Sequence, residues 1–262
     1  MKRLLTIALA GTAAIAALAQ PARADLLEDI TKAGKIRIAT DLAIPPSGMI
    51  DSAMKPTGSD VETAELLAKD WGLQLEFVQT TGATRIPNVQ TNKADIIIST
   101  LSVTPERAKV IDFSKPYAAL QSVVGCLKSI DAKSWDDLKG KTIAVSRGTT
   151  QDTTLTNMKE RDLKLTRYED DATMVTAAVS GQADCVATSA TIVSQIGVKA
   201  PARPFEPKVS ITNFDLAIGV KKGEPKLLEK LDAWVEQNLK NGKLNAIYKK
   251  FHGTELPANM RG

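Results

Sequence analysis

Residues 85–107, RIPNVQTNKADIIISTLSVTPER, contain a helix, a strand and a helix start in close succession. Residues 87–92 predict a short helix, and the nearly continuous apolar run 94–99 predicts a buried strand. Thr104 suits the N-cap of a second helix, and Pro105 suits its first turn. A strand that is apolar on both faces and lies between helices indicates a parallel α/β sheet.

Two arginines, Arg85 and Arg107, bound this segment. A fixed guanidinium binds a carboxylate through two parallel hydrogen bonds, so two arginines facing one cleft would suit a ligand with two carboxylates. Each also has an ordinary explanation. Arg85 alone reads as a solvated surface residue, and Arg107 as a paired one, although the dipole of a first helical turn opposes its charge. An anion site at this helix start is the functional alternative for Arg107.

The same strand and helix order extends outward in both directions. The first unit has a strand at 35–40, which ends at Asp41 before two prolines, a helix from residue 60 to 71, and a strand at 73–79. A second unit repeats this order, with strands at 141–145, 163–168 and 183–188 and helices from 151 and at 172–180. The apolar stretch 120–127 joins the units. The chain returns through a strand at 214–220 and two amphipathic helices lined by residues 228–239 and 244–251.

The predicted strands end in polar residues: Thr40-Asp41, Ser99-Thr100, Ser146-Arg147 and Thr188-Ser189. Ligands of open α/β sheets bind beyond the carboxyl ends of the strands. Two facing lobes would therefore bring these residues to one crevice. The segment Gly148-Thr149-Thr150-Gln151 would add hydroxyl and amide groups from the second unit. This segment can also be explained as an ordinary capped turn, and Asp41 as a residue that forms a turn.

The first 24 residues predict a secretory signal peptide. Lys2 and Arg3 precede the uncharged apolar run 4–19, and residues 22–24 read A-R-A, a cleavage signal. The run is shorter than the roughly 20 apolar residues of a membrane span. The mature chain is therefore expected to begin near Asp25, outside the cytoplasmic membrane. Loss of Lys2, Arg3 and Arg23 lowers the net charge from +4 to +1, so the charge does not indicate a nucleic-acid partner.

Histidine and cysteine usage restricts the chemistry further. The chain has one histidine, which argues against a Ser-His-Asp triad or a multi-histidine metal site. Its two cysteines, Cys126 and Cys185, would enter an oxidising compartment, and the sequence leaves open whether they pair.

The mature chain resembles the extracytoplasmic solute-binding proteins of ABC importers, in the polar amino-acid family (family 3). The resemblance rests on the order of its motifs, among them ATDLAIPP, IDFSKPY and VSRGTTQD, and most specifically on residues 95–117. It implies a type II periplasmic-binding fold in which two α/β lobes, joined by two hinge strands, close on a ligand. Lobe 1 is expected to comprise residues 25–121 and 214–262, and lobe 2 residues 122–213. The resemblance also implies a periplasmic monomer that delivers an amino acid to permease subunits, without a cofactor.

The resemblance also implies roles for several residues. Arg107 is expected to clamp the α-carboxylate of the ligand, and Thr100 and Ser102 to hydrogen-bond its α-amino and carboxylate groups. The Thr149-Thr150 loop is expected to close over the carboxylate.

The identity of the ligand depends on Asp41, Arg85 and Ser189. In the family, the position of Asp41 faces the ligand side chain. An arginine at the position of Arg85 marks members that bind glutamate or aspartate, so an acidic amino acid is expected. Ser189 departs from the family, which usually has an aspartate there to receive the α-ammonium. Either Asp41 substitutes for that aspartate, or the ligand is a dicarboxylate or 2-oxo acid without an ammonium.

Further departures and alternatives follow from the same resemblance. Ile44 and Gly82 stand where many members have an aromatic residue. A few members of the family are periplasmic dehydratases of prephenate-like acids. If this chain were one of them, Asp41 would be the general acid. The resemblance as a whole favours a binding protein without catalysis. The fold would place Cys126 and Cys185 in neighbouring strands, which allows either a disulfide or two buried thiols.

Overall fold

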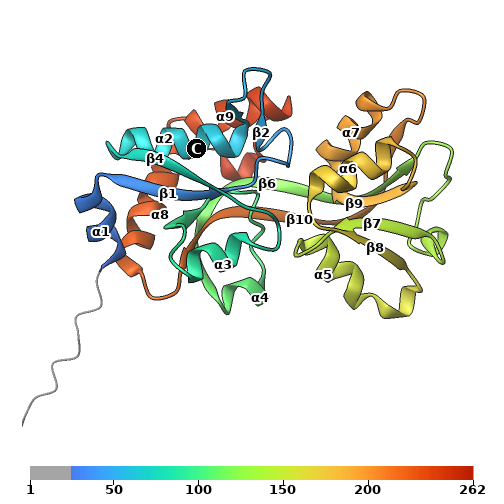
Figure 1. The fold of residues 1–262 in the computed structure, drawn as a ribbon, viewed down its shortest axis with the longest axis horizontal. Coiled ribbons are helices and arrows are strands. Elements are labelled where there is room, and N and C mark those ends of the chain that lie inside the picture. Colours follow the sequence, from blue (N-terminus) through green and yellow to red (C-terminus); the bar gives the residue numbers. More distant parts are fainter. Residues whose placement is uncertain (1–24, 262) are drawn as a thin grey trace, which may run out of the picture.

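The computed structural model describes residues 25–261, so the signal peptide predicted for residues 1–24 lies outside the described part. Two lobes lie side by side and are joined by two long strands, β6 and β10 (Figure 1). One sheet runs through both lobes in the order β4-β1-β5-β10-β6-β9-β7-β8. Its strands are β1 (Lys35–Thr40), β4 (Gln74–Gln79), β5 (Ile96–Ile97), β6 (Ile111–Leu127), β7 (Thr142–Ser146), β8 (Lys164–Tyr168), β9 (Cys185–Ser189) and β10 (Phe205–Lys221).

The helices cover the faces of this sheet (Figure 1). They are α1 (Leu26–Ala33), α2 (Ser59–Asp70), α3 (Arg85–Gln90), α4 (Pro105–Ala108), α5 (Thr150–Asn157), α6 (Asp171–Val179), α7 (Ala190–Lys199), α8 (Pro225–Lys240) and α9 (Lys243–His252). A small hairpin of β2 (Met49–Ile50) and β3 (Pro56–Thr57) projects from the first lobe, and short 3-10 turns occur at residues 136–138, 159–161 and 258–260. In the described part of the chain, no helix has the length and apolar character needed to cross a membrane.

The prediction of parallel strands is right for three strands in each lobe, but the crossing strands join them in antiparallel pairs, β10 with β5 and β6 with β9. Strand β1 pairs in parallel with β4 and β5, and β7 pairs in parallel with β8 and β9. The crossing strands β6 and β10 are instead antiparallel to each other over almost their whole length. Both strands begin well before the apolar stretches 120–127 and 214–220. The sequence pattern did not indicate their amino-terminal halves, because buried and exposed positions alternate irregularly there.

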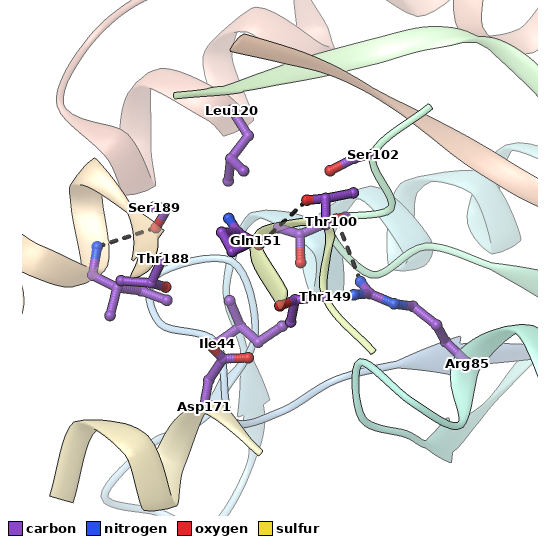
Figure 2. A pocket seen from close by; sticks show the side chains of 12 residues that line it. Ile44, Arg85, Thr100, Ser102, Leu120, Thr149, Gln151, Asp171, Thr188 and Ser189 are labelled. Atoms are coloured by element: carbon purple, nitrogen blue, oxygen red, sulfur yellow. Dashed lines mark hydrogen bonds between the residues drawn. The ribbon is translucent and has the colours of Figure 1, made fainter. Parts of the chain in front are cut away.

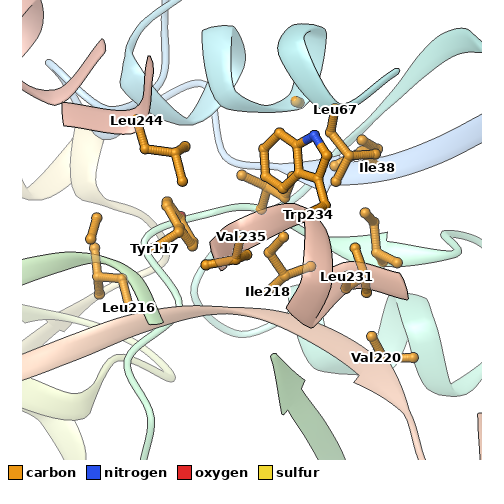
Figure 3. Close-up of a cluster of buried hydrophobic side chains, with 14 of the residues drawn as sticks. Ile38, Leu67, Tyr117, Leu216, Ile218, Val220, Leu231, Trp234, Val235 and Leu244 are labelled. Atoms are coloured by element: carbon orange, nitrogen blue, oxygen red, sulfur yellow. The ribbon is translucent and has the colours of Figure 1, made fainter. Parts of the chain in front are cut away.

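Each lobe has its own apolar core. In the first lobe, α2, α8 and α9 pack on one face of the sheet around residues that include Ile38, Leu67, Ile218 and Trp234 (Figure 3). In the second lobe, one cluster lies under α6 and α7, and another lies on the opposite face, around α5. That second cluster contains a disulfide between Cys126 and Cys185, which are register partners in the antiparallel pair β6–β9.

Candidate functional site

A cavity lies between the lobes and is lined from both sides (Figure 2). Its walls are formed by Ile44, Arg85, Thr100, Ser102, Leu120, Thr149, Thr150, Gln151, Asp171, Thr188, Ser189 and Ile192. The cavity volume is about 30 Å³, which leaves room for a few water molecules at most. An amino acid therefore requires the lobes to move apart before it enters.

Arg85 is a buried residue of the cavity wall, not a surface arginine. It begins helix α3 and is 3% exposed. Its Nη1 donates to the carbonyl oxygens of Ser99 (2.5 Å) and Thr100 (3.4 Å), while its Nε has no partner among the described residues. Burial lowers the pKa of Arg85, and nearby carboxylates, Asp41 foremost, oppose that shift. The guanidinium is thus anchored on one side and has unused hydrogen-bonding capacity.

The hydroxyl of Thr100, in the cavity wall, also has unused hydrogen-bonding capacity. Its hydroxyl Oγ1 is buried and has no partner among residues 25–261. Its backbone adopts a left-handed conformation (φ 42°), and its amide N donates to Asp60 Oδ2 at 2.7 Å. The other oxygen of Asp60 accepts a bond from the Tyr117 hydroxyl, also at 2.7 Å, and burial raises the Asp60 pKa to about 6. A buried carboxylate therefore fixes the backbone turn that presents Thr100.

Arg107 lies outside this cavity, at a neighbouring opening between the lobes. The predicted cap is present, because Thr104 Oγ1 accepts from the Arg107 amide at 3.2 Å, although the helix has only four residues. The guanidinium donates to the carbonyl oxygens of Ser102 (3.0 Å) and Gly148 (3.2 Å). Burial, and then the charge of Arg85, lower the Arg107 pKa to about 9. In this arrangement Arg107 links the two lobes and does not share a cavity with Arg85.

Asp41 is buried behind the cavity wall and is not among the lining residues. It is 2% exposed, and its Oδ1 accepts from the Ala43 amide at 2.9 Å, as in the turn considered from the sequence. Its Oδ2 has no partner among the described residues. Burial raises the Asp41 pKa, and the charge of Arg85 opposes this.

Asp171 lines the cavity, and it was absent from the site predicted from sequence. It is the first residue of helix α6 and is 5% exposed. Burial, followed by the charge of Asp41, raises its pKa to about 6. The preceding residue, Asp170, already caps the helix by accepting from the Thr173 amide at 2.8 Å. Two consecutive aspartates where one is enough for capping are the signal that could have identified Asp171.

The predicted second-lobe residues Thr149, Thr150 and Ser189 all line the cavity. The Thr149 hydroxyl caps α5 and donates to the Ser146 carbonyl at 2.7 Å. The Ser189 hydroxyl caps α7 by accepting from the Ile192 amide at 3.2 Å. Ser189 therefore uses its side chain locally.

The lobes approach each other closely at two glycines, Gly82 and Gly148. A Cβ atom on Gly148 (φ 71°) would lie 2.7 Å from the Cα of Ala83, and one on Gly82 would lie 2.8 Å from the Arg147 carbonyl oxygen. These contacts explain why no aromatic residue stands at Gly82, since the second lobe occupies the space of a side chain there.

Comparisons with known proteins agree with this architecture. The family model described as bacterial extracellular solute-binding proteins, family 3, matches residues 36–254. A probable histidine-binding protein of Neisseria gonorrhoeae is 26% identical, over 97% of this chain and 97% of its own length. Two solved structures are also similar. The solute receptor for L-cysteine of Neisseria gonorrhoeae has a TM-score of 0.80 at 30% identity and covers 86% of this chain and 92% of its own. The ancestral amino acid-binding protein AncCDT-1, a precursor of cyclohexadienyl dehydratase, has a TM-score of 0.76 at 34% identity and covers 86% and 98%.

The predicted type II periplasmic-binding fold is confirmed by these structural similarities. The crossing strands and the residues that line the interlobe cavity all lie within the region that the family model matches. On this evidence the chain belongs to the bacterial extracellular solute-binding proteins of family 3.

Proposed function

We propose that this chain is the periplasmic binding component of an ABC amino-acid importer and that its ligand is an acidic amino acid, glutamate or aspartate. The family and its amino-acid-binding relatives support the first part. In this proposal residues 25–121 and 214–262 form one lobe and residues 122–213 the other, and the ligand is held between them and released to permease subunits. The relatives reported above are named for histidine and cysteine, so the acidic ligand rests on this chain's own residues.

The observation that carries the acidic ligand is the state of Arg85. A guanidinium that is buried, anchored through Nη1 and unpartnered at Nε is suited to a carboxylate that arrives from the cavity. None of the described carboxylates forms an ion pair with it within 4.0 Å. Arg107, at the entrance between the lobes, would hold the α-carboxylate together with Ser102 once the lobes part and close again. The two arginines would then serve two separate carboxylates.

Calorimetric titration tests this proposal on protein that has been unfolded and refolded to remove carried-over ligand. Glutamate, aspartate, glutamine and histidine are titrated into the wild type, Arg85→Ala and Arg107→Ala. We expect Arg85→Ala to weaken glutamate by roughly 30-fold or more, in line with about 2–5 kcal/mol for a lost buried charge pair, and glutamine far less. Arg107→Ala is expected to weaken all ligands that carry an α-carboxylate. Equal losses of glutamate and glutamine in Arg85→Ala would assign Arg85 a structural role.

Two alternatives are tested with the same preparation. Tight binding of 2-oxoglutarate without binding of glutamate would identify a ligand that lacks an ammonium. Turnover of prephenate would identify a dehydratase, which needs a proton donor in the cavity. Asp41, the donor considered from sequence, does not line the cavity, whereas Asp171 does. We expect no turnover, because the arginine and hydroxyl groups of the site bind a ground state.

A further inference from the structure

The resemblance to the family implies an aspartate at the position of Ser189 to receive the ligand's ammonium, but this chain has a serine there, and its side chain already makes a local hydrogen bond. The Ser189 hydroxyl accepts a hydrogen bond from the Ile192 amide at 3.2 Å and caps helix α7. A hydroxyl carries no charge, and an ammonium that is buried without a carboxylate loses its hydration without a compensating charge. An amino acid bound in this cavity therefore needs another acceptor.

Asp171 is the carboxylate placed to act as that acceptor. Figure 2 shows its side chain extending from the start of α6 into the same cavity that Ser189 and Thr188 line. Although the residue is 5% exposed, no lysine, arginine or histidine among residues 25–261 forms an ion pair with it. A hydrogen bond from Ser146 and the charge of Arg85 compensate only part of the cost of burying this carboxylate, because its pKa stays raised. The remaining cost is consistent with a cation that arrives from outside.

Unpartnered polar atoms around the cavity point to a ligand independently of Asp171. The Thr100 hydroxyl faces it from the first lobe, is more than nine-tenths buried and has no hydrogen-bond partner among the described residues. Asp41 Oδ2 is likewise buried and unpartnered behind the wall. An ammonium group has three donors, and a site for it needs several acceptors from different directions.

A structural role at the start of α6 does not account for Asp171. A carboxylate in a first helical turn gains from the helix dipole, but it does so at the surface too. Asp170 already provides both the cap and the negative charge, with Thr173 completing a capping box. Burial and the charge of Asp41 both disfavour the ionised form of Asp171, so helix stability alone does not favour a carboxylate there.

We propose that Asp171 receives the α-ammonium group of the bound amino acid, in place of the aspartate that is absent at Ser189. This inference rests on the proposed function, and it adds a specificity-determining residue from the second lobe. It accounts for a site that selects amino acids although the usual acceptor is missing.

The test compares Asp171→Asn with Asp170→Asn, a matched control that removes a charge from the adjacent residue and keeps the cap. Each variant and the wild type, expressed from the full-length chain, are titrated with L-glutamate and with glutarate, which is glutamate without its amino group. We expect Asp171→Asn to weaken glutamate about 30-fold or more and to leave glutarate within about threefold or tighter. Asp170→Asn should leave both within about threefold. Circular dichroism verifies that the variants are folded.

Four results decide the question. Equal loss of glutamate and glutarate in Asp171→Asn overturns the inference while leaving the proposed function in place. A wild type that binds glutarate or 2-oxoglutarate as tightly as glutamate also overturns it, because no ammonium is then recognised. If the wild type binds a neutral or basic amino acid instead, the proposed acidic ligand is wrong, and the same comparison is made with that amino acid and its analogue without the amino group. Loss of affinity for the amino acid alone in Asp171→Asn would still support the role of Asp171, and equal loss for both compounds would overturn it. Failure to bind any amino acid refutes both proposals.

Discussion

Asp171→Asn is expected to stabilise the ligand-free protein while it weakens ligand binding. Burial and the neighbouring charge of Asp41 raise the Asp171 pKa from 3.8 to about 6. Each unit corresponds to about 1.4 kcal/mol, so the ionised carboxylate costs about 3 kcal/mol of stability at neutral pH. The amide carries no charge and avoids this cost, although its own polar atoms need partners. We therefore expect a gain of about 1–3 kcal/mol in the free energy of unfolding at pH 7.5.

The pH dependence has a definite sign. The folded-state pKa lies above the unfolded value, so the folded state binds more protons between about pH 4 and 6, and this group adds stability as the pH falls through that window. The advantage of Asp171→Asn over the wild type should accordingly shrink to under about 1 kcal/mol at pH 4. Urea unfolding of both proteins and of Asp170→Asn, at pH 7.5 and pH 4, measures it. An Asp171→Asn protein that is no more stable than the wild type at pH 7.5, or whose advantage persists at pH 4, would refute the reasoning.

Two further predictions concern lobe closure and the disulfide. Gly148→Ala should weaken ligand binding in calorimetry about tenfold or more, because the added Cβ would lie 2.7 Å from Ala83 Cα across the cleft. Gly140→Ala is the control, because Gly140 has nearly the same φ (69° against 71°) but nothing within 4 Å of an added Cβ, and it should leave binding unchanged. Equal effects of the two changes would mean that backbone strain, not closure, is responsible. Replacing Cys126 and Cys185 by alanine opens a loop with a sequence separation of 59 and should lower the free energy of unfolding by about 4 kcal/mol in urea, with affinity within about threefold. A stability change below about 1 kcal/mol would contradict this estimate.

The proposed function would explain a conflict between stability and binding at Asp171. In that proposal the lobes close on a ligand, and closure brings carboxylates and arginines from both sides into a volume with little water. The buried charges are unfavourable until a ligand of complementary charge fills the cavity. Ligand binding would then supply the energy that favours the closed arrangement over the open one.

Local chemistry in the sequence determined most of the secondary structure. The Thr104 cap and the apolar strands of both lobes follow from hydrogen-bonding and burial preferences within a few residues, and the structure has them. The order of the motifs was enough to indicate the family. The polar strand ends led to Thr100 and Ser189, and the segment that follows Arg147 led to Thr149 and Thr150. The pair of arginines led to Arg85, and the family resemblance led to Ser102; these six residues line the cavity.

Only the tertiary structure decided which side chains share a cavity. Arg107 and Asp41 belong to the same motifs as the lining residues, yet the packing of the lobes places both outside the wall. Asp171 reads locally as a helix-start residue, and its burial beside Arg85 and Asp41 depends on contacts between segments more than 80 residues apart in sequence. Local preferences do not encode desolvation or long-range charge, because both arise only when the lobes are brought together.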